Sequence, residues 1–532
     1  MRIERIGAVS VEQPAAEIVG AKAANLARVA ALGLPVPPAF VLPIGLCEAI
    51  VNREPAARQQ LADGLAEGIA FLEDATGRVF GDRRRPLLVS VRSGAARSMP
   101  GMLDTILDVG CTSAAIHGLI RMSGRPRFAF DCRRRFLESY GSIVLGAGPE
   151  MFKTRSDAMI LAEAAADEQE LDSEAIERLA ASYQQGIEDD HGALAEAPME
   201  QLRAAAEAVY RSWMSARAVT YRKLQHFDDL RGTAVTVQAM VFGNSGPCSG
   251  AGVAFSRDPS SGAATPVIDV LFGCQGEDVV SGKHTPETEE SITRALPEVA
   301  AQLRDALARL ESGFGDVQDV EFTIEDGKLW ILQTRAAKRS PQAALRFAID
   351  FVNSGRITPG EALRRLNGVD LNRLACKRLT DVGQPVGRGT GASAGIAVGR
   401  AAFDPVSAAR LADAGNPIIL VRPDTSTADV AGFAVSSGIV TAVGGRTAHA
   451  ALVARQMDKP CIVGCADLAV DADARCAHLP LAVVREGDWL SIDGDAGTIY
   501  LGRGTILSER PETELAEVQR WRTSMHALAE QG

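Results

Sequence analysis

The sequence predicts a multidomain α/β protein. Its 532 residues exceed what one hydrophobic core usually organises, so about three domains are expected. Apolar strand-like runs, such as residues 417–421 and 438–443, occur in the same chain as Ala-rich helical stretches, such as residues 157–186 and 199–224. The combination of short apolar runs with longer helical patterns is typical of α/β architectures.

Composition excludes several functional classes. The net charge of −11 lacks the basic footprint of a nucleic-acid-binding protein. Nine cysteines are scattered without a disulfide framework, which fits a reducing compartment. The first ten residues contain no signal-peptide core, and no apolar run reaches membrane-spanning length. We therefore expect a cytoplasmic protein that binds neither nucleic acid nor a membrane.

The first helical stretch carries a lysine that could reach a phosphate. The stretch opens at Gly20, contains Lys22 and ends at Gly33, after which residues 33–42 form an extended run. A lone lysine on an Ala-rich helix is usually only solvated. Lys22 is therefore a candidate that needs support from the rest of the chain.

A second candidate, Arg92, lies at the end of a predicted strand. Residues 87–93 are strand-like, and residues 94–102 form a loop rich in small residues. Such a loop lets backbone N–H groups approach phosphates closely, and arginine adds a fixed, charged pair of donors. A glycine loop alone is a weak signal.

Between residues 112 and 282 the sequence predicts a helical region, a strand and two polar segments. Residues 112–230 read as mainly helical with little chemistry, and residues 235–242 read as a strand. Two further stretches, residues 251–259 and 276–282, contain Gly, Ser and acidic residues, and the second includes Glu277.

A β-hairpin is predicted where Asp319 and Glu321 share one face of a strand, because side chains alternate between faces. A two-residue Asp-Gly turn would place Gln333 on the apolar face. A three-residue loop, residues 325–327, places Gln333 and Arg335 with the carboxylates instead. We predict the three-residue loop, which also keeps together the apolar side chains of Val320, Phe322, Ile324, Trp330 and Leu332.

The predicted polar face of the hairpin could bind a metal and a nucleotide. Two carboxylates beside an amide can hold Mg²⁺ and a nucleotide together. An amphipathic surface hairpin shows the same alternation, so the pattern alone leaves both interpretations open.

The second half of the chain begins with a helical connector. Residues 358–361 form a capping box with proline at the first helical position. Residues 382–399 contain six glycines and lead into a new domain with a compact α/β pattern. Residues 510–532 read as one helix.

The histidine near the centre of this last domain is the strongest catalytic candidate. A strand-like run, residues 438–443, leads through Gly444 and Gly445 to Thr447, the predicted helix N-cap, and His449 then lies in the first helical turn. Free N–H groups and the positive end of the helix dipole favour an anion there. Neutral imidazole is a competent nucleophile near pH 7. A lone histidine beside a cap is more commonly structural.

Residues 444–455 resemble the phosphohistidine motif of the phosphoenolpyruvate (PEP)-utilising enzymes, which include pyruvate phosphate dikinase and PEP synthase. The segments around Lys22 and Arg92, residues 251–259 and 276–282, and the hairpin are similar to dikinase segments. The resemblance covers residues 1 to about 505. Two residues depart from the dikinase pattern: His284 stands where arginine is expected, and Arg446 is typical of the synthase, whereas many dikinases carry methionine there.

The resemblance implies an ATP-grasp nucleotide-binding domain over residues 1–340, with a helical subdomain over about 112–230. A helical connector, residues 341–380, would lead to a swivelling β/β/α phosphohistidine domain, residues 381–505, and a C-terminal helix, residues 506–532. In the family a barrel that binds pyruvate or PEP follows. The chain ends where that barrel would begin, so we expect it on a separate subunit.

The resemblance also implies a reaction. His449 would take the β-phosphoryl group of ATP with Mg²⁺, inorganic phosphate would take the γ-phosphoryl group, and AMP would leave; pyruvate on the separate subunit would be the onward acceptor. Asp319 and Glu321 would hold the metal. The residues that would contact ATP are Lys22, Arg92, Arg135, Glu277, Asp319, Glu321, Gln333 and Arg335.

Other interpretations stay open. The chain could be a synthase-like phosphotransferase with another acceptor, or a nucleotide-binding regulatory protein in which His449 does not react. In some dikinases the threonine that matches Thr447 is phosphorylated by a regulatory kinase, which would crowd negative charge beside the histidine. The final acceptor and the oligomeric state, a homodimer included, are not determined by the sequence.

Overall fold

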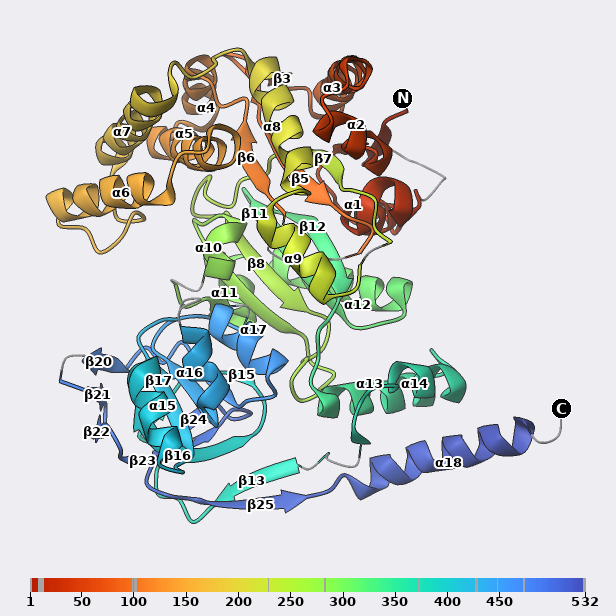
Figure 1. Ribbon diagram of the computed structural model, residues 1–532, viewed down its shortest axis with the longest axis vertical. Helices are drawn as coiled ribbons and strands as arrows, with labels where there is room; N and C mark the ends of the chain where they lie inside the picture. The colour runs from red at the N-terminus through yellow and green to blue at the C-terminus, as the bar shows by residue number, and fades with distance from the viewer. Residues whose placement is uncertain are drawn as a thin grey trace. The chain divides into compact units, whose positions relative to one another are not determined.

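The structure is a computed structural model (Figure 1). It describes residues 2–7, 14–97, 99, 103–227, 229–281, 284–371, 374, 376–425, 429–446, 448–471 and 474–529. The chain divides into two compact units: unit 1 comprises Met1–Ser249 and Ile324–Thr334, and unit 2 comprises Gly250–Thr323 and Arg335–Gly532. Within the described ranges, no helix is both long enough and apolar enough to cross a membrane.

Unit 1 is built on a five-stranded sheet in the order β1-β2-β7-β5-β6. Neighbouring strands are antiparallel throughout. Strands β2 and β7 are buried at every position, as expected for central strands covered on both faces. The strands are β1 (Glu4–Ile6), β2 (Ala39–Leu42), β5 (Val89–Gly94), β6 (Thr105–Val109) and β7 (Ala234–Ala239), with a short pair formed by β3 (Val79–Phe80) and β4 (Pro86–Leu87).

Helices cover this sheet, and the prediction that residues 112–230 are mainly helical is confirmed. Their apolar faces share one core with the strands, in which Phe136, Tyr183 and Tyr210 are fully enclosed. The helices are α1 (Ala16–Ala31), α2 (Cys47–Val51), α3 (Pro55–Thr76), α4 (Ser113–Ser123), α5 (Pro126–Tyr140), α6 (Pro149–Glu163), α7 (Ser173–His191), α8 (Pro198–Ser212) and α9 (Ala216–Leu224), with shorter turns at Ile44–Leu46 and Gly141–Leu145.

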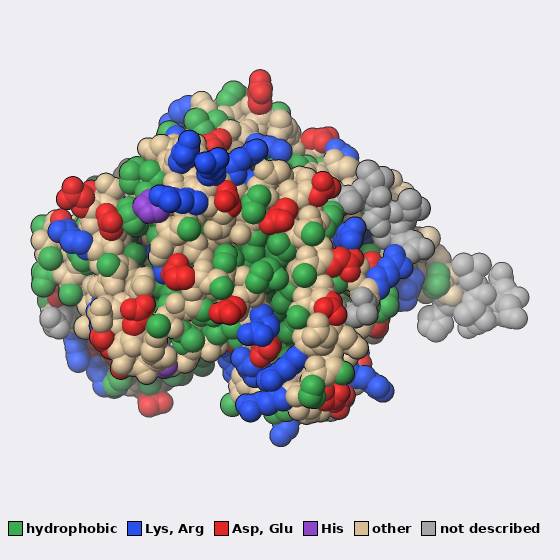
Figure 2. All heavy atoms as spheres, turned by 90° about the horizontal axis from the view of Figure 1, so that it is seen from above, with side chains coloured by type: hydrophobic (Ala, Val, Ile, Leu, Met, Phe, Trp, Pro, Cys, Tyr) green, Lys and Arg blue, Asp and Glu red, His purple; other side chains and the backbone are tan. Residues whose placement is uncertain are grey.

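Charged side chains of both signs mix on the surface seen from above. Figure 2 shows short groups of Lys and Arg side chains interspersed with Asp and Glu side chains on that face. The Arg83–Arg85 group follows this pattern, since the Asp82 carboxylate accepts the backbone N–H groups of Arg84 and Arg85 at 2.8 and 2.9 Å. The group therefore belongs to a local turn rather than to an extended basic surface.

A second five-stranded sheet has the order β10-β9-β8-β11-β12. Its hairpin, β11 with β12, belongs to both units, because residues 324–334 are assigned to unit 1. The strands are β8 (Gly250–Phe255), β9 (Val267–Phe272), β10 (Glu287–Thr288), β11 (Gln318–Glu325) and β12 (Lys328–Ala336), and the helices of this region are α10 (Gly276–Ser281), α11 (Glu289–Ala295) and α12 (Pro297–Phe314).

The predicted three-residue hairpin loop is wrong. Strand β11 continues through Glu325, and β12 starts at Lys328, so only Asp326 and Gly327 form the turn. Both have positive φ, 46° and 77°, as a type I′ turn requires. Contacts outside the hairpin stabilise it: Gly327 N–H donates to the Cys248 carbonyl at 2.9 Å.

The shorter turn changes which side chains share a face. Leu329, Ile331 and Gln333 alternate on one face of β12, and all three are buried. Trp330 and Leu332 are only partly buried. Gln333 therefore lies on the buried face with the apolar side chains, as the rejected two-residue turn implied.

Two connector helices follow the hairpin, and the predicted cap is confirmed. Helices α13 (Pro341–Asn353) and α14 (Pro359–Arg365) start at proline, and the Thr358 hydroxyl accepts the Glu361 N–H at 3.2 Å. Helix α18 (Glu512–Ala529) packs on them through Val518 and Trp521.

The C-terminal helix starts later than the residue 506 predicted. Residues Thr505–Glu509 form strand β25, which pairs with β13 (Cys376–Thr380) in a two-stranded antiparallel ribbon. Helix α18 begins only at Glu512. The pairing is made to a segment more than a hundred residues away in the chain, so a local helical pattern could not reveal it.

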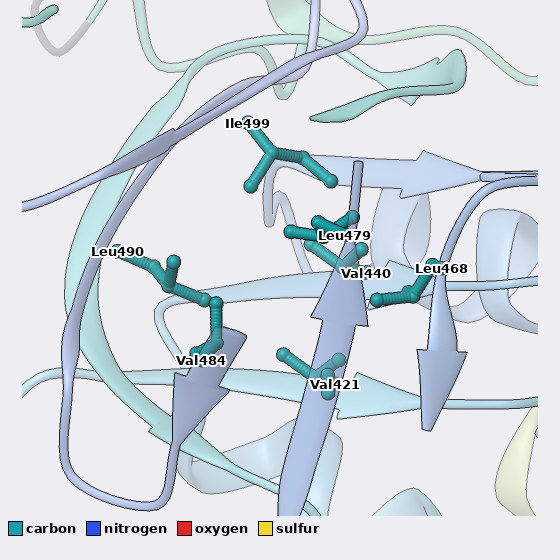
Figure 3. A pocket seen from close by; sticks show the side chains of 8 residues that line it. Val421, Val440, Leu468, Leu479, Val484, Leu490 and Ile499 are labelled. Carbon is teal, nitrogen blue, oxygen red and sulfur yellow. The ribbon is translucent and has the colours of Figure 1, made fainter. Parts of the chain in front are cut away.

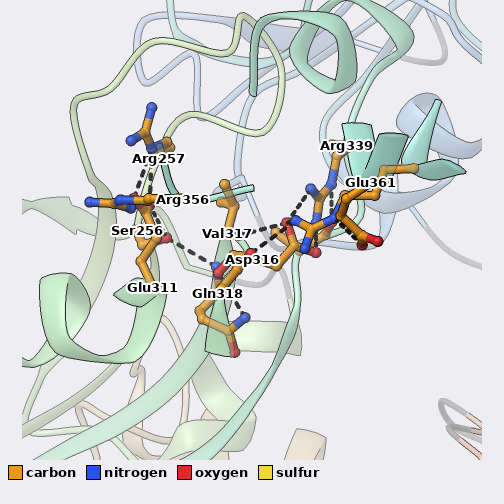
Figure 4. A network of polar contacts seen from close by, with 12 residues as sticks. Ser256, Arg257, Glu311, Asp316, Val317, Gln318, Arg339, Arg356 and Glu361 are labelled. Carbon is orange, nitrogen blue, oxygen red and sulfur yellow. Dashed lines mark hydrogen bonds and ion pairs between the residues drawn. The ribbon is translucent and has the colours of Figure 1, made fainter. Parts of the chain in front are cut away.

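An ion-pair network joins the connector to the second sheet (Figure 4). The buried Glu311 carboxylate at the end of α12 accepts the Ser256 hydroxyl at 2.9 Å and the Arg257 Nε at 3.0 Å, and it pairs with Arg356 beyond α13. Arg339 makes a two-pronged pair with Asp316, at 2.7 and 2.9 Å. Bidentate arginine pairs constrain orientation as well as distance, so the start of the connector is held to this sheet.

The remaining residues form a mixed eight-stranded sheet in the order β14-β24-β23-β16-β17-β18-β19-β15. Strands β16 to β19 run parallel at its centre. The elements are β14 (Gly387–Arg388), β15 (Thr390–Ser393), β16 (Ile396–Ala402), β17 (Ile418–Arg422), β18 (Gly438–Thr441), β19 (Cys461–Val463), β23 (Trp489–Asp493) and β24 (Thr498–Leu501), with α15 (Pro405–Asp413), α16 (Val430–Val435) and α17 (His449–Gln456).

A small sheet, β20 (Ala469–Asp471), β21 (Cys476–Leu479) and β22 (Ala482–Arg485), packs on the large one through an apolar core. Figure 3 shows Val421 and Val440 of the large sheet beside Leu479 and Val484 of the small one. The cavity between them has a volume of only about 10 Å³, which is too small for more than one water. This region is packed core and not a ligand site.

One glycine sets the path of α1 and offers a test of the fold. Gly20 has φ +81°, and a Cβ added there would lie 2.1 Å from the Gly94 carbonyl oxygen. We expect Gly20→Ala to lower the free energy of unfolding by about 1–3 kcal/mol, because both the backbone conformation and the contact become strained. Urea denaturation monitored by far-UV circular dichroism measures the change.

The matched control is Gly45→Ala, since a Cβ at Gly45 meets no atom within 4 Å. It should change stability by less than about 0.5 kcal/mol. Equal stability of the two variants would contradict this account of Gly20.

Candidate functional site

In unit 1, α1 and the end of β5 meet along their backbones. The Ala21 N–H donates to the Ala95 carbonyl at 2.9 Å, directly after the close approach of Gly20 to Gly94. Lys22 is the next residue on α1 and is exposed. Arg92 lies on β5 between Thr105 of β6 and Thr236 of β7. The structure thus brings the segments of the two predicted phosphate-binding cations together.

Helix α1 also contacts β12. The Asn25 side-chain amide donates to the Thr334 carbonyl at 3.1 Å, one residue after Gln333. The Ile331 N–H donates to the Pro35 carbonyl at 2.8 Å, which holds the strand against the segment that follows α1. Lys22, Arg92 and Gln333 therefore belong to three elements of unit 1, of which α1 contacts both β5 and β12.

In unit 2, the acidic pair is centred on Asp319. Its Oδ2 atom accepts the Arg335 Nε at 2.8 Å, and the residue is 7% exposed. Its Oδ1 atom is buried and has no hydrogen-bond partner among the described residues. Burial raises the pKa of the Asp319 carboxyl, an effect that Arg335 opposes and that the negative charge of Glu321 adds to.

An oxygen donor without a partner suits a divalent cation. Mg²⁺ prefers carboxylate oxygens and keeps several waters, so it needs only one or two protein carboxylates. Asp319 offers a buried oxygen, and Glu321 lies two residues further along the same strand and is partly exposed. The residues therefore fit such a metal.

Two further predicted ligands belong to other elements. Glu277 is exposed in the first turn of α10. Arg135 lies on α5 in unit 1, where its Nε donates to the Asp131 Oδ2 at 3.0 Å. Asp131 also accepts Arg134 and the Asn244 amide. Although burial opposes ionisation, Arg135 and Arg134 hold the pKa of Asp131 well below its usual range. Arg135 is thus part of a buried ion-pair cluster.

His449 is the first residue of α17, so its predicted place in the first helical turn is confirmed. The N-cap is Ala448, with extended dihedral angles and no capping side chain, one residue later than predicted. Thr447 and the side chain of His449 lie outside what the structure describes. The chain enters the helix through Gly444, whose φ of +109° favours glycine.

The loop before His449 is fixed to β9. The Arg446 N–H donates to the Asp269 Oδ2 at 2.8 Å, and the Arg446 Nε donates to the Gly391 carbonyl at 3.0 Å. A Cβ at Gly445 would lie 2.5 Å from Pro286, so the backbone approaches too closely for any other residue. Burial raises the pKa of the Asp269 carboxyl, while Arg446 and Arg455 oppose the rise.

Sequence reasoning missed Asp269 and Asn25. An acidic residue at the centre of an apolar strand is an anomaly that the sequence shows, because a buried carboxylate needs a partner. Asn25 carries no comparable signal, since asparagine on a helix surface is ordinary. The partners of both residues are far away in the chain.

The predicted site residues thus fall into two groups. Unit 1 contains Lys22, Arg92, Gln333 and Arg135, and unit 2 contains Glu277, Asp319, Glu321, Arg335 and His449.

Comparison with protein families gives two matches. Residues 53–297 and 287–351 match the model described as "Pyruvate phosphate dikinase, AMP/ATP-binding domain". Residues 415–497, which include His449, match the model described as "PEP-utilising enzyme, mobile domain".

Curated relatives are similar over almost the whole chain. The "Pyruvate, phosphate dikinase" of Clostridium symbiosum is 39% identical over 493 residues, which cover 91% of this chain and 56% of the relative. The protein of the same name from Rhizobium meliloti is 38% identical, covering 94% and 58%. "Pyruvate, phosphate dikinase 2" of Zea mays is 37% identical, covering 95% and 58%. The chain therefore spans about half the length of the curated relatives it matches.

The raised pKa of Asp319 predicts a pH-dependent stability. The folded chain holds the proton to higher pH than the unfolded chain, whose carboxyl titrates near 3.8. Stability from this group is therefore complete below pH 3.8 and is lost as pH rises through the folded pKa. The free energy of unfolding of Asp319→Asn, minus that of the wild type, should increase from about pH 4 upward and then level off. Urea titrations across about pH 4–7 measure it.

Asp404→Asn is the control. Despite partial burial, hydrogen bonds from Ser407 hold the pKa of Asp404 below its ordinary value of 3.8. The stability that Asp404 contributes is lost only as pH falls below that value. The free energy of unfolding of Asp404→Asn, minus that of the wild type, should therefore stay constant over the same pH range. A flat difference for Asp319→Asn as well would contradict the assignment.

Proposed function

The chain belongs to the pyruvate phosphate dikinase family of PEP-utilising enzymes, and from this membership we propose that it transfers the β-phosphoryl group of ATP to His449. The observation that carries the proposal is one chain that joins an AMP/ATP-binding domain to a mobile-domain match containing a histidine at a helix start. ATP, Mg²⁺ and inorganic phosphate are the proposed reactants.

The nucleotide is proposed to bind on an ATP-grasp fold formed by the first 340 residues. Lys22, Arg92 and Arg335 offset the negative charge of the phosphates, and Gln333 donates or accepts a hydrogen bond. Glu277 and Arg135 belong to the same proposal, although Arg135 is already paired with Asp131. Phosphoryl transfer depends mostly on positioning and charge compensation, which fits this set.

Asp319 and Glu321 are proposed to hold Mg²⁺. The metal would neutralise charge on the phosphates during transfer. The unpartnered Asp319 Oδ1 supports the assignment, because an ionised oxygen buried without a partner is costly unless a ligand completes it. Arg335 keeps the other oxygen oriented.

On the acceptor side, a ring nitrogen of His449 forms the P–N bond while the bond between the β-phosphorus and the oxygen retained by AMP breaks. The γ-phosphoryl group passes to inorganic phosphate, which gives pyrophosphate. The start of α17 directs free N–H groups towards the incoming phosphoryl group, and its dipole favours that charge.

The second half-reaction is proposed to pass the phosphoryl group to pyruvate, reached by a swivel of residues 381–505. The ribbon of β13 and β25 supports a hinge, since it joins both ends of that segment beside the connector helices. Thr447 is a proposed regulatory phosphorylation site, where added charge would repel the phosphoryl donor.

The proposal predicts phosphorylation of one histidine. Incubation with Mg-ATP and phosphate should add the mass of one phosphoryl group, measured by intact-mass spectrometry, and acid should remove it. His449→Ala should abolish the gain, because no nucleophile is left at the helix start.

Asp319→Asn should slow phosphorylation by about 10²-fold or more, because the metal loses a ligand. An equal mass gain in His449→Ala would reject the role of the histidine. Tight ATP binding without AMP release would favour a nucleotide-binding regulatory protein instead.

A synthase-like reaction is the second candidate, because Arg446 matches the synthase form of the motif. In that reaction water takes the γ-phosphoryl group, so AMP forms without added phosphate. Chromatographic measurement of AMP with and without inorganic phosphate separates the two. Strict dependence on phosphate supports the dikinase reaction, and independence supports the synthase reaction.

A further inference from the structure

Arg455 lies on the same helix as His449 and ties that helix to the preceding loop. Its Nε donates to the Ala451 carbonyl at 3.1 Å, and its Nη2 donates to the Arg446 carbonyl. Arg446 is in turn held by Asp269. One amino group of Arg455 thus fixes the loop that leads to the histidine.

The rest of the guanidinium faces the second sheet of unit 2. Its central carbon lies 5.7 Å from the centre of the Phe255 ring on β8. The negative charges of Asp319 and Asp269 in this sheet, and of Asp258 in the loop after β8, raise the pKa of Arg455. None of the carboxylates in the described ranges forms an ion pair with it. Burial is the largest influence on Arg455 and lowers its pKa.

Among the described residues, this mostly buried cation has two carbonyls and one aromatic ring as partners and no paired anion, so its charge is incompletely compensated. Removing a guanidinium from water is costly unless an anion accompanies it. Among the described residues, the same region holds the buried Asp319 oxygen without a partner. A phosphate chain with a bound cation supplies both missing charges, since the metal meets the carboxylate and the phosphate oxygen meets the guanidinium.

We propose that Arg455 is a catalytic residue that binds the transferring phosphoryl group with one amino group while it holds the loop of His449 with the other. The inference rests on the proposed function, which supplies the phosphoryl donor. Arginine suits this double task because its donors form a rigid planar fork, whereas lysine offers a single point charge. Arg446, by contrast, is held through its backbone N–H by Asp269 and through its Nε by the Gly391 carbonyl on β15.

Two measurements on Arg455→Gln and Arg455→Lys test the proposal. The first is the rate of acid-labile phosphorylation of His449 by Mg-ATP and phosphate. We expect a decrease of about 10²–10³-fold for Arg455→Gln and a smaller decrease for Arg455→Lys, because developing charge loses its donor. Added guanidinium chloride should partly restore labelling in Arg455→Ala.

The second measurement is calorimetric binding of magnesium tripolyphosphate, which needs no turnover. Its affinity should fall about 10-fold in Arg455→Gln, as expected for one lost charge-assisted hydrogen bond. The matched control is Arg410→Gln on α15, an exposed arginine that pairs with Glu486 in the same domain. It should change neither measurement.

The outcomes separate the two proposals. If the wild type is not phosphorylated but binds tripolyphosphate about 10-fold more tightly than Arg455→Gln does, the proposed function is rejected and the anion contact of Arg455 is supported. Normal labelling and normal tripolyphosphate affinity in Arg455→Gln overturn the role of Arg455 and leave the proposed function intact. The role is also overturned if the wild type does not bind tripolyphosphate. It is overturned as well if Arg455→Gln is labelled slowly but has a lower melting temperature, and guanidinium does not restore labelling in Arg455→Ala.

Discussion

The chemistry of this protein depends on buried charge that is only partly compensated. The Asp269 carboxylate lies in an apolar strand and accepts the backbone N–H of Arg446, the residue three positions before His449. A buried carboxylate must find donors, so the strand and the loop cannot separate without a cost in free energy. The same contact requires glycine at position 445, because a Cβ there would lie 3.0 Å from the Asp269 Oδ2 atom and 2.5 Å from Pro286. This carboxylate is thus one of the contacts that place the start of α17, together with the bond from Arg455 to the Arg446 carbonyl.

The hairpin of β11 and β12 applies the same constraint to the nucleotide side. Asp319 keeps one oxygen on Arg335, and its other oxygen is buried without a partner among the described residues. An apolar side chain at this position would give a more stable fold, because a buried carboxylate oxygen without a hydrogen-bond partner lowers stability. Its presence is consistent with a site that is completed only by a ligand, and the raised pKa of Asp319 is the electrostatic sign of that incompleteness. The complete ion-pair cluster of Asp131, by contrast, holds its carboxyl pKa low and stiffens α5.

The proposed phosphoryl transfer would need a domain that changes position, and the parts of unit 2 differ in how firmly they are held. The network around Glu311 and Asp316 holds the start of the connector to the second sheet. Beyond it, the segment that carries His449 is joined to the connector by the exposed β13–β25 ribbon. Few apolar contacts and exposed backbone hydrogen bonds are the features expected of an element that opens at low cost.

Local pattern was enough to identify the α/β class, the helical region from residue 112, the Thr358 cap and the position of His449 in a first helical turn, because each follows from neighbouring residues. It failed at the hairpin, where the Asp-Gly pair itself favours the two-residue turn that the alternation argument rejected. It also failed at residues 505–509, which are extended because β13 pairs with them, and the helix of His449 begins one residue later than predicted. The partners of Asp269, Asn25 and Arg455 are likewise set by folding, since contacts across hundreds of residues leave no periodic trace in the chain.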